Sequence, residues 1–180
     1  MTTRLKTDFQ QRVVICGVDE RDRLQSRQIT HLLTIGNPGG PISKPPWFHG
    51  PQLHLVFGDV VSEGDARQCR TKAATLEDIQ QAIQFCRSAW SRVESIVLIS
   101  CNYGASRSPA LAYVAIADQL GPGREAEALQ LVMQIRSAAV PNRLVVQLGD
   151  KFLQRHGALL EPLREFYRFL NEQLAPRRTS

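Results

Sequence analysis

The most constraining feature of the sequence is a stretch in which a strand, a loop and a helix follow one another without a gap. Residues 95–100 form an apolar run that predicts a buried strand, and Cys101 follows it directly. Arg107 comes six residues after the cysteine, and a helical pattern begins at once. A tight loop that opens a helix turns its backbone N–H groups toward one point. The stretch therefore predicts a cradle for a doubly charged anion with a thiol at its base.

The spacing of cysteine and arginine alone is weak evidence, because Cys86 and Arg92 have the same spacing. That copy contains no glycine and lies in a helical pattern, where backbone N–H groups bond within the helix. The Cys101 copy contains Gly104, which tolerates the φ values of a tight loop, and Pro109 suits the first helical turn after it. We therefore expect Cys86 to be a core residue and Cys101 to be functional.

The whole sequence predicts one α/β domain over residues 1–180, with a core at about 13–160. Apolar runs alternate with segments of helical periodicity, without an internal repeat or a domain boundary. The expected strands are 13–18, 31–35, 53–57 and 95–100. The expected helices are 19–27, 75–90, 108–120, 124–137, 142–156 and 162–174. Residues 36–52 are expected to form a long loop, and 60–74 an irregular polar segment.

The charge and the cysteine pattern narrow the possible partners. The net charge of +5 comes mainly from arginine, which suits phosphorylated or other anionic partners. No basic-aromatic array is present, so nucleic acid is not the expected partner. The four cysteines and four histidines are scattered, so no metal site is expected. No signal peptide and no membrane-length apolar run is visible, and we expect a cytoplasmic protein.

The predicted cradle fits the chemistry of phosphate monoester cleavage. A thiolate is a strong nucleophile, and a thiol at a helix N-terminus ringed by N–H donors ionises more easily. Arg107 can hold two phosphoryl oxygens with its planar fork. Ser108 can stabilise the leaving thiolate of Cys101, or it can simply satisfy the helix N-terminus. Ser106 is expected to serve the loop geometry.

The leaving group of such a reaction needs a proton. Asp59 is the best candidate for the general acid, because it closes a predicted strand beside Gly58. Glu63 and Asp65 in the same segment compete for this role, and a strand-end turn carboxylate is the structural alternative. Both Asp59 and Cys101 follow strand ends, so they can converge at one edge of the sheet.

With these residues in place, the sequence resembles the dual-specificity branch of the protein tyrosine phosphatase superfamily, and most of all its short bacterial tyrosine phosphatase-like members. The family's Cys-x-x-Gly-x-Ser-Arg-Ser loop is similar to a run of eight residues here: Cys101, Asn102, Tyr103, Gly104, Ala105, Ser106, Arg107 and Ser108. Residues 135–148, with Pro141, Asn142 and Gln147, are similar to a second segment of that branch. The stretch 53–60 is similar to the strand and loop that carry its acid.

The resemblance implies a central four- to five-stranded, mostly parallel sheet flanked by helices, with no metal and no cofactor. It implies that Cys101 is the nucleophile, Arg107 the phosphate clamp and Asp59 the acid. Asn142 would brace the phosphate-binding loop from outside.

Three positions depart from the family pattern. Ser100 stands where the family usually has the His that helps hold the thiolate, so a weaker nucleophile is expected. Tyr103 replaces a small residue and is expected to crowd or line the pocket. Ser137 replaces a proline, a change of little chemical weight.

The sequence leaves the substrate open. The expected activity is that of a cysteine-dependent protein tyrosine or dual-specificity phosphatase acting on phosphorylated proteins. A nucleotide, an RNA 5′ end or a phosphoinositide is an alternative substrate, because the loop contacts only the phosphate. A weak pseudophosphatase that binds phosphorylated partners is a second alternative. A rhodanese-type sulfurtransferase fits poorly, since it does not require Ser-Arg-Ser.

Overall fold

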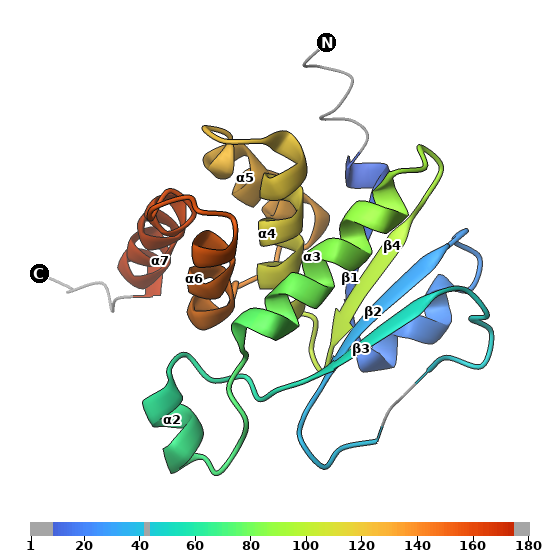
Figure 1. Ribbon diagram of the computed structural model, residues 1–180, viewed down its shortest axis with the longest axis horizontal. Coiled ribbons are helices and arrows are strands. Elements are labelled where there is room, and N and C mark those ends of the chain that lie inside the picture. Colours follow the sequence, from blue (N-terminus) through green and yellow to red (C-terminus); the bar gives the residue numbers. More distant parts are fainter. Residues whose placement is uncertain (1–8, 42–43, 175–180) are drawn as a thin grey trace, which may run out of the picture.

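The computed structural model describes residues 9–41 and 44–174, and the described strands form one parallel sheet (Figure 1). The four strands are β1 (Val13–Gly17), β2 (His31–Gly36), β3 (Gln52–Val56) and β4 (Val97–Cys101). Their order across the sheet is β1-β4-β2-β3, and every neighbouring pair is parallel. The predicted mostly parallel sheet is therefore confirmed, with β4 inside it between β1 and β2.

The strands are apolar nearly throughout because both faces of the sheet are covered. Alternate residues of β4 pack into different clusters: Val97 and Ile99 join the main core, and Leu98 packs on the opposite face. Helices α3 (Leu76–Trp90), α4 (Arg107–Leu120), α5 (Glu125–Ile135), α6 (Arg143–Phe152) and α7 (Leu160–Leu174) gather on one side of the sheet (Figure 1). The 3-10 helix η1 (Val18–Leu24) lies on the other side.

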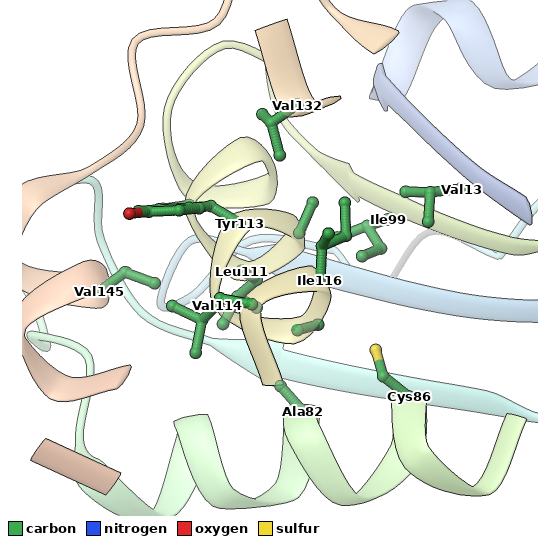
Figure 2. Close-up of a cluster of buried hydrophobic side chains, with 14 of the residues drawn as sticks. Val13, Ala82, Cys86, Ile99, Leu111, Tyr113, Val114, Ile116, Val132 and Val145 are labelled. Carbon is green, nitrogen blue, oxygen red and sulfur yellow. The ribbon is translucent and has the colours of Figure 1, made fainter. Parts of the chain in front are cut away.

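Helix α4 occupies the centre of the main core, which explains why it is apolar on almost every face. Cys86 on α3 points into this cluster together with Ile99 and Ile116 (Figure 2). Its side chain is 2% exposed, and burial raises the pKa of its thiol to about 12. The prediction that Cys86 is a core residue is confirmed.

Three predicted segments differ from the structure. Residues 60–74 contain a short helix, α2 (Glu63–Gln68), which periodicity missed because only Ala66 is buried. The Ser62 hydroxyl accepts from the backbone N–H of Asp65 and starts this helix. The helix predicted over 142–156 ends at Phe152, because the chain turns back so that Asp150 accepts from two later backbone N–H groups. The segment 19–27, predicted as a short helix, is the 3-10 helix η1.

The carboxyl ends of the four parallel strands meet at one edge of the sheet, where ligand sites of such folds lie. Cys101 ends β4, and Asn37 follows β2 directly. Asp59 comes three residues after β3, and η1 follows β1. The topology thus collects residues from four distant parts of the sequence around one loop.

Candidate active site

The loop between β4 and α4 has the tight form that the sequence predicts. Cys101 is the last residue of β4, and α4 begins at Arg107. Between them, Gly104 has a φ of 66° and lies against the backbone of Cys16 and Gly17, with no room for a side chain. The carbonyl of Asn102 accepts from the Val18 N–H at 3.1 Å. The loop is therefore closed against the end of β1, and a residue other than glycine at position 104 would open it.

Cys101 is buried at the base of this loop, with 2% of its surface exposed. The Ser108 hydroxyl lies 3.2 Å from Cys101 Sγ and donates to it. Ser108 is itself fully buried. Of the two roles considered for Ser108, contact with the sulfur is the one that this geometry supports.

Arg107 is held by the ends of two strands. Its Nη1 donates to Asn37 Oδ1 at 2.7 Å and to the Phe57 carbonyl at 2.8 Å. Its Nε lies 3.9 Å from Asp59 Oδ2 and has no hydrogen-bond partner among the described residues, although Arg107 is 2% exposed. A buried cationic N–H without a partner is costly, so this position suits an anion.

Asp59 lies directly over the loop. Its Oδ1 accepts from Ser106 Oγ at 2.7 Å and from Asn142 Nδ2 at 2.8 Å, and 37% of its side chain is exposed. The competing carboxylates are in α2: Glu63 is 84% exposed and lies 4.0 Å from Arg67, and Asp65 makes no contact with the loop within the described chain. Of these three, only Asp59 contacts the loop. Ser106, expected to serve loop geometry alone, also holds Asp59.

Asn142 connects the loop, Asp59 and α6. Its backbone N–H donates to the Ser106 carbonyl at 3.1 Å, and its Oδ1 accepts from the Val145 N–H at 3.1 Å. Two positions earlier, the Val140 N–H donates to the Ala105 carbonyl at 2.6 Å. The chain at Asn142 therefore lies against the outside of the loop while its side chain reaches over to Asp59.

No protein-family model matches this chain, and no curated protein matches it either. Several solved structures match this chain. Human DUSP28 matches at 18% identity and a TM-score of 0.61, over 81% of this chain and 94% of that chain. The human tyrosine phosphatase-like serine/threonine/tyrosine-interacting protein matches at 19% identity and a TM-score of 0.59, over 79% and 88%.

PTPMT1 in complex with PI(5)P matches at 16% identity and a TM-score of 0.57, over 80% of this chain and 91% of that chain. The chain has the dual-specificity phosphatase fold. The fold that the resemblance implied is confirmed, in its four-stranded form.

Tyr103 stands where the family pattern has a small residue, and the structure shows where its side chain lies. It is 81% exposed and forms part of the wall of a cavity of about 360 Å³ beside the loop, with Asn37, Arg21 and His54. Its carbonyl accepts from Arg136 Nη2 at 3.2 Å. The wall of this cavity includes neither Cys101 nor Arg107, so the expectation that Tyr103 crowds or lines the phosphate pocket stays a prediction.

The structure places further residues around the candidate site that sequence reasoning missed. Glu20 Oε1 accepts from Arg136 Nη1 at 2.8 Å, and Glu20 Oε2 accepts from the Gly17 N–H at 2.6 Å. The two hydrogen bonds hold the pKa of Glu20 below its usual range. Asn37 and Arg21 were also missed, because each contacts the site across a long sequence separation. Asn37 follows a predicted strand end, which was the one available signal.

No group of three or more His, Cys, Asp or Glu side chains in residues 9–41 and 44–174 could hold a metal ion. His54 lies beside Thr34 instead, with Nδ1 at 2.6 Å from Thr34 Oγ1. Within the same residues, no helix has both the length and the apolar character needed to cross a membrane.

Proposed function

We propose that this chain hydrolyses phosphate monoesters through a cysteinyl-phosphate, with phosphotyrosine or phosphoserine and phosphothreonine in proteins as the substrate class. One observation supports the proposal above all. A buried thiol with a serine donor, a buried guanidinium with an unpartnered Nε and a half-exposed carboxylate meet at one loop. Each group has the chemistry that one step of the reaction needs.

In the first step, the thiolate of Cys101 attacks phosphorus and the bond to the leaving oxygen breaks. The loop N–H groups, the α4 N-terminus and Arg107 stabilise the charge that spreads over the phosphoryl oxygens. Asp59 gives its proton to the leaving oxygen.

In the second step, the Asp59 carboxylate takes a proton from a water molecule, which attacks the cysteinyl-phosphate. The sulfur–phosphorus bond breaks and returns the thiolate, which the hydrogen bond from Ser108 stabilises. Inorganic phosphate then leaves, and Asp59 is protonated again for the next cycle.

Two other functions remain as specific alternatives. PTPMT1, which has the same fold, is seen with PI(5)P, so a non-protein phosphomonoester is the second candidate substrate. The tyrosine phosphatase-like serine/threonine/tyrosine-interacting protein also has this fold, and Ser100 in place of the usual His favours comparison with a binding module. Turnover separates the enzyme from the module, and a panel of phosphopeptides, phosphoinositides and nucleotides separates the substrates.

The decisive experiment is hydrolysis of p-nitrophenyl phosphate with vanadate as inhibitor. We expect Cys101→Ser to lose turnover by roughly 10⁶-fold, as when the nucleophile of a serine protease is removed, while it still binds vanadate through the intact loop. Cys86→Ser is the matched control, since its thiol is buried in the core away from the loop, and we expect normal turnover. Full turnover in Cys101→Ser, or no turnover in the parent protein, would remove the proposal.

A further inference from the structure

The residue before the candidate nucleophile is tied to a buried arginine from another part of the chain. Ser100 is fully buried, and its Oγ accepts from Arg21 Nε at 2.9 Å. Arg21 is on η1 and is 4% exposed. The residue immediately before Cys101 in the sequence therefore accepts a hydrogen bond from a buried guanidinium.

Ser100 belongs to a row of polar side chains that crosses the sheet on the face covered by η1. It pairs in register with Cys16 of β1 and with Thr34 of β2, and Thr34 pairs with His54 of β3. All four side chains lie on the face opposite α4, by strand alternation with the core residues. The other interior residues of the four strands are apolar. These four side chains therefore form a polar row on the face of the sheet that η1 covers.

Arg21 interacts with two thiols as well as with nearby carboxylates. Burial lowers the pKa of Arg21, and the interactions that oppose this effect come first from Cys16 and Cys101, and only then from Asp22 and Asp19. Burial, and after it the charge of Arg21, lowers the pKa of His54. Burial raises the pKa of Cys16 to about 11, so Cys16 stays a neutral thiol near pH 7. Cys101, which the proposed reaction uses as the nucleophile, is the other thiol that interacts with Arg21.

Other charges also face Cys101. Arg107 lies at the start of α4, and Arg136, which follows α5, interacts with Cys101 as well as with Glu20. Asp59 opposes them from the loop after β3. Arg107 is committed to the phosphate in the proposed reaction, and Arg136 is neutralised by Glu20 at 2.8 Å. Arg21, in contrast, donates a hydrogen bond to the hydroxyl of Ser100, the residue immediately before Cys101.

We propose that Arg21, bound to Ser100, is a positioning residue that stabilises the thiolate form of Cys101 from behind the loop. This pair takes the place that a single His has in the family which the sequence resembles. The hydroxyl of Ser100 fills the small buried position, and the guanidinium supplies the positive charge from η1. The inference rests on the proposed function for its meaning, and its test does not depend on turnover.

The test is the pH profile of Cys101 alkylation by iodoacetamide, a neutral probe, in the Cys69→Ser background. Cys69 is exposed and must be removed, whereas the high pKa values of Cys16 and Cys86 keep them unreactive. We expect Arg21→Met to move the midpoint of the profile upward by about one pH unit, the size of effect that one close opposite charge has. Arg21→Lys, which keeps the charge, should move it less.

Arg12→Met is the matched control for the loss of a buried guanidinium. Arg12 is 9% exposed and donates to the carbonyls of Trp90, Arg92 and Ser95, at the other end of the sheet. The Arg12→Met variant should have a lower free energy of unfolding but the same midpoint of the Cys101 alkylation profile. The Arg21→Met/Ser100→Ala double variant should shift no further than Arg21→Met alone, because the two residues act as one unit.

An unchanged midpoint in Arg21→Met overturns the inference, and so does an equal shift in Arg12→Met. If Arg21→Met does not fold, Ser100→Ala decides in its place, because it removes the acceptor that holds the guanidinium, and an unchanged midpoint in Ser100→Ala overturns the inference. Absence of turnover in the parent protein counts against the proposed function instead. The alkylation profile still tests Arg21 in that case, since thiolate formation needs no substrate.

Discussion

The side-chain amide of Asn142 donates to Asp59 Oδ1 at 2.8 Å, although the two residues are 83 positions apart in the sequence. The same amide donates to the Val60 carbonyl at 3.1 Å, so the segment that carries Asp59 is tied to the start of α6. The candidate acid is thus held from outside its own loop.

Asn142→Ser separates this contact from the capping of α6. Serine keeps an oxygen that can accept from the Val145 N–H, so stability should change little, while the donor to Asp59 is lost. We expect the rate for phenyl phosphate to fall by about tenfold, as Asp59 loses its orientation. Steady-state rates and chemical denaturation measure the two effects. A large loss of stability with normal kinetics would show that Asn142 is only a cap.

Asp59→Asn should slow substrates with poor leaving groups most. Asparagine keeps an acceptor for Ser106 and Asn142 but has no proton to give at the needed strength. We expect a loss of roughly 100-fold for phenyl phosphate and a much smaller one for p-nitrophenyl phosphate, whose leaving group needs no proton. Asp65→Asn on α2 is the control. Equal losses for both substrates would return the acid role to Asp65 or Glu63, or leave Asp59 a structural one.

Arg107→Lys should be almost as inactive as Arg107→Ala. Lysine keeps the charge, but it lacks the planar fork and cannot bond Asn37 and the Phe57 carbonyl in the same way. We expect both variants to lose at least about 100-fold in kcat/KM. Arg87→Lys, at a bidentate pair with Asp118 on the surface of α3, should keep full activity. Near-normal rates in Arg107→Lys would mean that charge alone is sufficient.

The lowered pKa of Glu20 means that the stability of the folded protein should depend on pH. Its pKa in the folded protein is depressed, first by the hydrogen bond from Arg136 and then by that from the Gly17 N–H. A depressed carboxyl pKa contributes stability above the unfolded pKa of about 4.3, and this stability is lost as the pH falls through the folded pKa.

The measurement is denaturant unfolding of Glu20→Gln and the parent protein from pH 7 to pH 3. The variant should be less stable at pH 7, and the difference should shrink as the pH falls below about 5. Glu94→Gln is the control, because Glu94 is exposed and has no ion pair among the described residues. A difference that stays constant with pH would mean that the Glu20 contacts do not depend on its charge.

Much of the fold followed from local patterns in the sequence. The apolar run before Cys101 and the helical pattern after Arg107 each have the period of one element, and period is a local property. The alternation of strands and helices then indicated one α/β domain, and the family resemblance implied that its sheet is mostly parallel. Helix α2 was not predicted, because it has six residues with one buried side chain and so shows no helical periodicity.

The sequence by itself determined the elements of the site: a thiol at a strand end, a glycine that allows the loop to close, and an arginine at the start of a helix. Only the tertiary structure decided which distant side chains complete it. Asn37 follows β2, Asn142 caps α6 and Arg21 lies on η1, and nothing in their local sequence records the partner that each will meet. The reason is physical, since a local pattern reflects burial and backbone conformation, whereas a hydrogen bond across 70 or 79 residues exists only once the sheet has brought its strand ends together.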